Sequence, residues 1–296
     1  MMYSPIALFV YNRPDHFKRT IDSLIINDLA LKSDLIIFSD GAKDITDEKS
    51  VQKVREIIKE IQGFKSVKSE QSDINKGLAK SIIYGVTNTV KKFGRIIVLE
   101  DDMIVSPYFL NFMNEALDIY EREENVISIH GYIYPVKKQL PETFFLRGAD
   151  CWGWATWKRG WDFFEEDSNF LIEQIDKSKL QKEFDLGGSV KNYRMLKNQR
   201  EGKIDSWAIR WHASAFIKNK LTLYPGKSLV KNIGTDGLGT HLGSTNVYDT
   251  FISEGKVNLK KIPLEVNKLN EQIISEYFRS IKFKSRVSGL KKRLGI

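Results

Sequence analysis

Short apolar runs alternate with helical periodicities over the first 130 residues. Runs of consecutive apolar side chains predict buried strands at residues 5–10, 35–38, around 67, 96–99 and 126–129. Between these runs the apolar residues recur every three or four positions, as at Phe17, Ile21 and Leu24, which is typical of amphipathic helices. This alternation predicts an α/β fold, a mostly parallel sheet flanked by helices on both faces.

The pattern changes after about residue 140. Four tryptophans lie close together between residues 152 and 161. Helices are predicted near 170–183, 189–200 and 204–218, an edge strand at 221–225 and a Gly-rich loop at 232–241. We expect one compact unit in two lobes, residues 1–140 and a smaller lobe of residues 141–260, followed by a basic tail (261–296).

Three consecutive acids follow the central apolar run. Residues 96–99 lead directly into Glu100, Asp101 and Asp102, and Ser106 and Pro107 are suited to begin the next helix. The acids are therefore expected where a buried strand leaves the sheet, the edge at which ligands bind in open α/β sheets. Neighbouring carboxylates repel one another unless a cation compensates them. The run thus predicts a hard divalent ion, Mn²⁺ or Mg²⁺, with phosphates completing its shell.

Composition excludes several protein classes. The 296 residues are 42% hydrophobic and 28% charged, which is ordinary for a globular protein. The single cysteine, Cys151, rules out a disulfide framework or a Cys-based zinc site within one chain, and we expect it to be a small buried residue. We find no signal peptide and no apolar run of spanning length, so we expect a cytoplasmic protein. The missing Gly-x-Gly-x-x-Gly and P-loop motifs argue against a dinucleotide-binding dehydrogenase and a P-loop enzyme.

The net charge is +8, and much of the excess lies in residues 279–293, where Lys and Arg alternate with apolar residues. This pattern predicts peripheral contact with an anionic membrane surface, such as the inner face of a plasma membrane. A solvated tail or a helix packed on the body would explain it as well. No nucleic-acid-binding module accompanies the charge, so we expect no nucleic-acid partner.

Polar residues follow several of the predicted strands. Candidate nucleotide-binding residues at these strand ends are Tyr11, Asn12, Arg13, Asp40 and Lys76. Asp40 could accept a hydrogen bond from a base N–H or a ribose hydroxyl, and Arg13 and Lys76 could pair with phosphate. Each residue alone is more often a turn or cap residue, so the prediction depends on their joint position at one sheet edge.

Several motifs resemble a known family. The opening Pro5–Pro14 resembles the start of GT-A-fold glycosyltransferases, and Val98–Asp102 resembles the Glu-Asp-Asp segment of the N-acetylglucosaminyltransferase family that initiates complex N-glycans. Phe38–Gly41, Trp152–Trp154 and Ile204–Trp207 are similar to further segments of that family. Bacterial surface-polysaccharide transferases of the same architecture are expected to be close relatives.

The resemblance implies a metal-dependent glycosyltransferase with a UDP-linked donor, a glycan or lipid-linked acceptor and inversion at the anomeric carbon. It implies that residues 1–140 are the nucleotide-sugar-binding half and residues 141–260 the acceptor-binding and catalytic half. It implies that Asp102 binds the metal and that Glu100 and Asp101 hold ribose or a ligand water. It implies that Asp205 is the general base, with Trp207 as an apolar wall beside it. Ser206 departs from the family, which has a second acid there, and Asp205 could instead be a helix N-cap.

The remaining candidates lie in the second half. His241 could be a further metal or phosphate ligand on a Gly-rich loop that closes over the donor, or a surface residue. Trp152 and Trp154 could stack on acceptor sugars, although large aromatics more often serve the core. His130 and His212 are expected to be structural. Two other functions remain open: a sugar-nucleotide pyrophosphorylase, and a non-catalytic carbohydrate-binding protein on the same fold.

Overall fold

The computed structural model describes residues 3–235 and 246–294, with side chains up to Phe283. Its strands are β1 (Ile6–Val10), β2 (Asp34–Ser39), β3 (Ser66–Gln71), β4 (Arg95–Glu100), β5 (Met103–Val105), β6 (Val126–His130), β7 (Thr143–Arg147), β8 (Trp154–Trp157), β9 (Leu221–Pro225) and β10 (Val230–Asn232). Its helices are α1 (Pro14–Ile25), η1 (Ala30–Lys32), α2 (Ile45–Glu60), α3 (Leu78–Phe93), α4 (Phe109–Ile119), α5 (Lys158–Trp161), α6 (Ser168–Lys177), α7 (Gln181–Phe184), α8 (Asn192–Arg200), α9 (Trp207–Ile217) and α10 (Lys268–Leu294).

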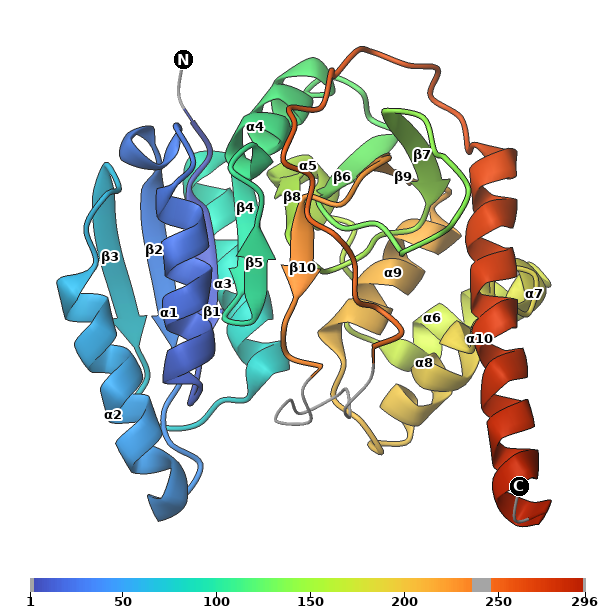
Figure 1. The fold of residues 1–296 in the computed structure, drawn as a ribbon, viewed down its shortest axis with the longest axis horizontal. Helices are drawn as coiled ribbons and strands as arrows, with labels where there is room; N and C mark the ends of the chain where they lie inside the picture. The colour runs from blue at the N-terminus through green and yellow to red at the C-terminus, as the bar shows by residue number, and fades with distance from the viewer. Residues whose placement is uncertain (1–2, 236–245, 295–296) are drawn as a thin grey trace.

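Within these ranges, eight strands form one twisted sheet in the order β3-β2-β1-β4-β8-β6-β9-β7 (Figure 1). The strands from β3 to β4 are parallel, and β6 pairs in parallel with β9. In between, β8 runs antiparallel to both β4 and β6, and β7 is antiparallel to β9. The predicted α/β class, with a mostly parallel sheet flanked by helices, is confirmed.

Alternating side chains of the strands bury two separate cores. In β1, Ile6, Leu8 and Val10 face the core formed with α1, α2 and α4, whereas Ala7 and Phe9 face the core formed with α3, α5 and α9. A strand that is apolar at every position needs cover on both faces, and the two helix layers provide it.

The tryptophan cluster is part of the second core. Trp154 is fully buried, and its ring lies 5.5 Å from Trp207, 5.8 Å from Trp161 and 5.9 Å from Trp211. Trp207 is 3% exposed. The prediction that Trp154 and Trp207 line the acceptor site is therefore wrong, because packing against the sheet and α9 takes both side chains out of contact with solvent.

Two further predictions are corrected, and one strand of the sheet was missed. The strand at 221–225 is not an edge strand, because β9 lies between β6 and β7. The helix after the acids begins at Phe109, so Ser106 and Pro107 precede it. The sequence did not indicate β8, which starts at Trp154.

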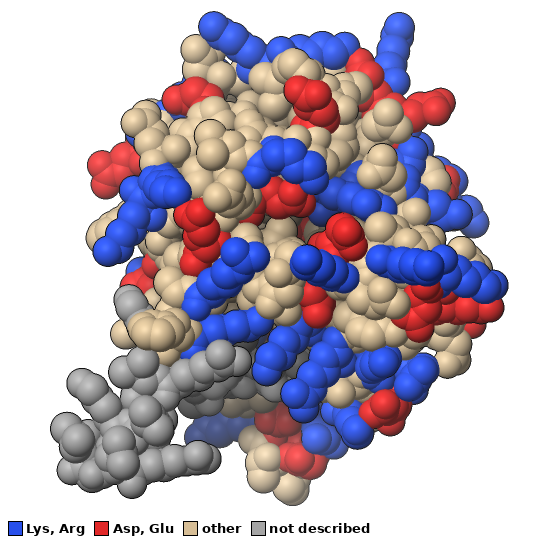
Figure 2. Space-filling view, turned by 90° about the vertical axis from the view of Figure 1, so that its right-hand side faces the viewer, with Lys and Arg blue, Asp and Glu red and all other residues tan. Residues whose placement is uncertain are grey.

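The C-terminal helix α10 lies along the side of the molecule next to α7 (Figure 1). Its first half packs on the body, with Asn270, Ile273 and Ile274 nearly fully buried. These buried residues precede the basic stretch 279–293, so the role of that stretch stays a prediction. Figure 2 shows Lys and Arg side chains spread widely over the face that carries α10, with acids between them. No helix in the described ranges is long and apolar enough to cross a membrane.

Candidate active site

The three acids occupy the turn between β4 and β5, at the carboxyl end of the central strand. Glu100 is the last residue of β4, and Asp101 and Asp102 form the turn that leads to Met103. β10 pairs antiparallel with β5, and the Ile233 N–H donates to the Asp102 carbonyl at 2.8 Å. The described start of the Gly-rich loop therefore lies directly on the acids.

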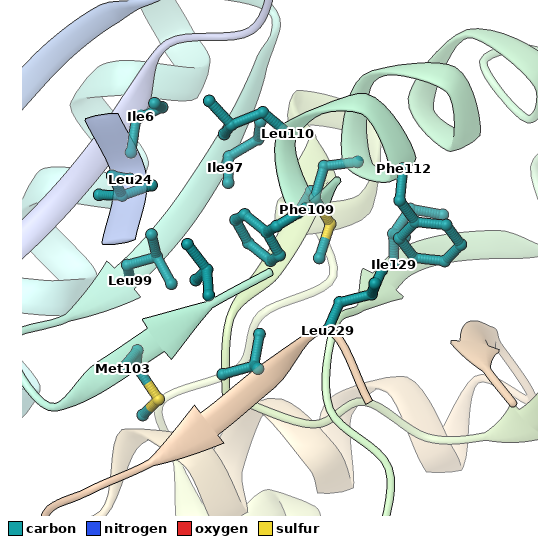
Figure 3. Packing of buried hydrophobic residues seen from close by; sticks show 14 of the residues in the cluster. Ile6, Leu24, Ile97, Leu99, Met103, Phe109, Leu110, Phe112, Ile129 and Leu229 are labelled. Atoms are coloured by element: carbon teal, nitrogen blue, oxygen red, sulfur yellow. The ribbon is translucent and has the colours of Figure 1, made fainter. Parts of the chain in front are cut away.

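The turn is supported from below by the larger core. Figure 3 shows Leu99, Phe109 and Leu229 meeting between β4, α4 and the segment that enters β10. Because these side chains are fully or almost fully buried, they fix the position of the acids that follow them.

Among the residues that the structure describes, Arg13 is the cation that pairs with this cluster. Its guanidinium ion-pairs with Asp101 and lies 3.1 Å from Oδ2 of Asp102. The Tyr11 N–H also donates to Asp101, at 3.3 Å. The structure thus brings together four of the predicted residues, Tyr11, Arg13, Asp101 and Asp102. In the structure Arg13 pairs with carboxylates, whereas the sequence suggested that it would pair with a phosphate.

One guanidinium does not neutralise three carboxylates in a buried turn. Burial, together with the charges of Asp102 and Asp101, raises the pKa of Glu100 to about 8. Burial also raises the pKa of Asp101 to about 6, although Arg13 opposes the shift. The cluster therefore has an excess of negative charge that an additional cation would relieve.

Asp102 has the open coordination position that a divalent ion requires. Its Oδ1 is buried and has no hydrogen-bond partner in the described part of the chain. Carboxylate oxygens are ligands that Mn²⁺ and Mg²⁺ accept, so the residues present fit such an ion. Residues 3–235 and 246–294 contain no group of three His, Cys, Asp or Glu side chains arranged around a common point. The predicted ligand His241 lies outside the described residues.

Gly234 closes over this carboxylate. A Cβ added at this glycine would lie 2.2 Å from Oδ2 of Asp102 and 3.0 Å from a guanidinium nitrogen of Arg13. Any side chain here would displace the acid, so the chain can follow this path only with glycine.

Tyr11 and Asn12, which follow β1 and precede Arg13, are held in place by a residue of helix α2. The Tyr11 hydroxyl donates to Asp47 at 2.5 Å, and the Asn12 amide donates to the same carboxylate at 2.6 Å. Asp47 was not predicted from the sequence, where it reads as an acid in the first turn of a helix. Its two bonds fix the loop that carries Arg13.

Asp40 serves mainly as a turn residue. Its carboxylate accepts hydrogen bonds from the backbone N–H groups of Gly41, Lys76 and Gly77 at 2.8–2.9 Å. The Lys76 ammonium lies 5.0 Å from the ring centre of Tyr84. Asp40 and Lys76 line a small cavity of about 150 Å³ at the ends of β2 and β3, separate from the contacts of Arg13 with the acids.

Asp205 is not the cap of α9. The Ser206 hydroxyl accepts from the Ile209 N–H and caps the helix, while Asp205 pairs with Arg210 at 3.1 Å. The Asp205 side chain is 60% exposed.

A second, larger cavity of about 770 Å³ opens between strands β6, β7 and β9 and helices α7 to α10. Trp152 lines it, and its ring lies 4.7 Å from that of Tyr132 and 5.5 Å from that of Tyr248. The acceptor-side role of Trp152 stays a prediction. Asp150 also lines the cavity and was not singled out from the sequence, where it is an isolated acid before the tryptophans.

Cys151 lies between the cavity and the acids. Burial raises the pKa of its thiol, and the negative charges of Asp150, Glu100 and Asp102 raise it further. A raised pKa favours the protonated thiol and so disfavours a nucleophilic role. The side chain is half-buried and lines the cavity, whereas the sequence predicted a buried residue.

Comparisons with known proteins agree with the resemblance. No family model matches the chain. The alpha-1,3-mannosyl-glycoprotein 2-beta-N-acetylglucosaminyltransferase of Arabidopsis thaliana is 22% identical over 178 residues, which are 55% of this chain and 39% of that enzyme. The chain thus matches less than half of the length of this relative.

Solved structures with similar folds include the mannosyltransferase PcManGT from Pyrobaculum calidifontis in complex with GDP-Man and Mn²⁺, at 12% identity, with a TM-score of 0.31 and covering 45% of this chain and 36% of that one. UDP-glucose pyrophosphorylase complexed with UDP-glucose is 11% identical, with a TM-score of 0.37 and covering 75% and 90%. The resemblance to an N-acetylglucosaminyltransferase is confirmed by the sequence match, and the chain is similar to that glycosyltransferase over 55% of its length.

Proposed function

We propose that this protein is a glycosyltransferase that moves a sugar from a nucleoside-diphosphate donor, by preference a UDP-sugar, to a glycan or lipid-linked acceptor. The observation that carries the proposal is the undercompensated cluster of Glu100, Asp101 and Asp102 at the carboxyl end of β4. An anionic turn of this kind is stable when a divalent cation and the diphosphate it binds occupy it.

In this proposal Asp102 holds Mn²⁺ or Mg²⁺ through Oδ1, and Glu100 and Asp101 bind ribose or a ligand water. The bound ion supplies Lewis-acid stabilisation of the charge on the departing diphosphate. Arg13, already held beside the acids by two ion pairs, orients the aspartates and contributes positive charge on the donor side. The cavity lined by Trp152 takes the acceptor.

The test is release of UDP or GDP from UDP-glucose, UDP-galactose, UDP-N-acetylglucosamine and GDP-mannose, with Mn²⁺ or with EDTA. Turnover that needs Mn²⁺ and disappears in Asp102→Ala supports the proposal. Asp22→Ala is the matched control, because this exposed carboxylate pairs with Lys18 away from the acids. Turnover that survives both EDTA and Asp102→Ala excludes the metal role.

Two companion measurements separate the other functions considered: pyrophosphate release and glycan binding. A pyrophosphorylase would release pyrophosphate from UTP and glucose 1-phosphate. A non-catalytic carbohydrate-binding protein would turn over no donor and would keep its glycan affinity in Asp102→Ala.

We further propose a place for the protein at the cytoplasmic face of a bacterial inner membrane, in surface polysaccharide synthesis. The basic sequence of α10 supports this, since residues 279–293 are rich in Lys and Arg. Sedimentation with phosphatidylglycerol vesicles, compared with phosphatidylcholine vesicles, tests it. Equal binding to both would rule out electrostatic attachment.

A further inference from the structure

Asp150 is a carboxylate on the wall of the large cavity whose orientation is fixed by two phenols. The Tyr134 hydroxyl donates to Oδ2 at 3.0 Å and the Tyr224 hydroxyl donates to the same oxygen at 3.2 Å. Both donors bind one oxygen, so Oδ1 keeps its capacity to accept a further hydrogen bond. The side chain is half-buried and lines the cavity, so a bound molecule can reach it.

The chain connects Asp150 directly to the acid cluster. β8 runs antiparallel to β4 with Trp154 opposite Val98, so the residues before Trp154 run beside those after Val98. A Cβ on Gly153 would lie 3.3 Å from the Leu99 side chain, which shows how closely the two segments approach. Cys151, the residue after Asp150, is close enough to Glu100 and Asp102 for the charges of both acids to raise the pKa of its thiol.

The walls around Asp150 suit a sugar ring. Trp152 is half-buried and presents an aromatic ring, against which the C–H face of a pyranose can pack. Tyr132 is buried and packs against this indole at 4.7 Å, which holds it in place. His130 is held by a hydrogen bond of 3.1 Å from the Trp152 N–H, and His212 is held by the Ala149 carbonyl at 2.8 Å. A rigid aromatic wall with a few fixed polar groups is the arrangement that orients a polyhydroxylated ligand.

Asp205, the base implied by the family resemblance, has different surroundings. Its carboxylate is largely exposed and paired with Arg210, and it does not line the large cavity. A general base must reach the proton it removes, and the geometry favours Asp150 for this contact.

We infer that Asp150 is the acceptor-side general base and that the large cavity holds a pyranose of a glycan acceptor; this inference rests on the proposed transferase function. The acceptor hydroxyl gives its proton to Oδ1 of Asp150 while its oxygen forms the bond to the anomeric carbon of the donor. The bond between that carbon and the diphosphate oxygen breaks, and its electron pair leaves with the nucleoside diphosphate.

The test compares Asp150→Asn with Asp205→Asn, using the four nucleotide sugars above, Mn²⁺, and p-nitrophenyl glycosides or water as acceptors. Asparagine keeps an oxygen that accepts from both phenols but cannot take a proton. Removing a general base lowers rates roughly 10²–10⁴-fold, so kcat of Asp150→Asn should fall by that factor while the donor KM stays near the wild-type value. Asp205→Asn should keep most of its kcat.

The opposite ranking, a wild-type kcat in Asp150→Asn and a large loss in Asp205→Asn, would overturn the inference. If Asp150→Asn does not fold, Tyr224→Phe provides the measurement, since it keeps the carboxylate and removes one of its two donors. About a tenfold fall in kcat with unchanged UDP affinity is then expected, and no change in kcat would count against Asp150.

UDP binding separates the two levels of the proposal. If the wild-type protein binds no UDP in the presence of Mn²⁺, the transferase function itself fails. If it binds UDP and turns over a donor equally well with and without the Asp150 carboxylate, only the inference about Asp150 fails.

Discussion

Arg13 lies 3.1 Å from Oδ2 of Asp102 while it also ion-pairs with Asp101, so a single guanidinium serves two neighbouring aspartates. Glu100 is left without a partner charge of its own among the described residues, and burial raises its pKa to about 8. This shared ion pair determines how the site tolerates its acids in the absence of a ligand.

Removing the guanidinium should expose the repulsion between the acids. We expect Arg13→Gln to lower the free energy of unfolding by about 2 kcal/mol in EDTA, since a partly buried pair loses its cation. Adding Mn²⁺ should restore more stability to this variant than to the wild type. Urea unfolding measures both effects, with Lys18→Gln as a control at an exposed pair that contributes about 0.5 kcal/mol or less. If Mn²⁺ stabilises Arg13→Gln and the wild type equally, Arg13 does not act on the charge of the metal site.

A substitution at Gly234 tests whether the chain must pass close to Asp102. A Cβ at this position would overlap Oδ2 of Asp102, so Gly234→Ala should weaken UDP–Mn²⁺ binding about tenfold or more, equivalent to about 1.4 kcal/mol. Gly255→Ala is the matched control, because a Cβ added there would meet no atom of the described residues within 4 Å. Calorimetric titration with UDP compares them, and equal affinities would mean that the acid does not bind the nucleotide complex.

His130 should make stability depend on pH. Burial lowers its pKa to about 4 against an ordinary value of 6.5, so the unfolded chain binds the proton more readily. Its contribution is complete above pH 6.5 and is lost as the pH falls toward 4, at up to about 1.4 kcal/mol per pH unit. Urea unfolding across this range should show a smaller slope in His130→Gln than in the wild type. Identical slopes would show that folding does not lower the pKa of this imidazole.

Replacing Trp152 should mainly affect activity, whereas replacing Trp154 should mainly affect stability. Trp154→Ala removes a fully buried indole and should cost about 3–5 kcal/mol of unfolding free energy. Trp152→Ala, at a half-buried cavity wall, should cost about 1–2 kcal/mol and mainly raise the acceptor KM. Thermal unfolding and transfer kinetics distinguish these outcomes; a stable Trp154→Ala variant with impaired acceptor binding would reverse the assignment.

The fold was predictable where periodicity and burial agree. The apolar run of β4 and the spacing of Phe17, Ile21 and Leu24 in α1 indicate elements that the structure contains. β8 was missed because four residues rich in tryptophan carry no alternation, and their strand exists only through pairing with β4 and β6. Such pairing depends on partners distant in sequence, which local patterns do not contain.

The sequence predicted where the candidate site lies, but it did not predict most of the side-chain contacts within the site. Glu100, Asp101 and Asp102 lie at the strand end as expected, but the pairing of Arg13 with two of them follows from tertiary approach. Asp150 was overlooked because its two donors, Tyr134 and Tyr224, lie on other segments that only the folded chain brings together.

The most direct test of the central claim is calorimetric titration of UDP into the wild-type protein with Mn²⁺ and again with EDTA. If a divalent ion at Asp102 links the acids to a diphosphate, UDP should bind with Mn²⁺, lose at least about tenfold in affinity with EDTA, and lose the same affinity in Asp102→Asn. UDP affinity that is absent in Mn²⁺, or unchanged by both EDTA and Asp102→Asn, would contradict the account.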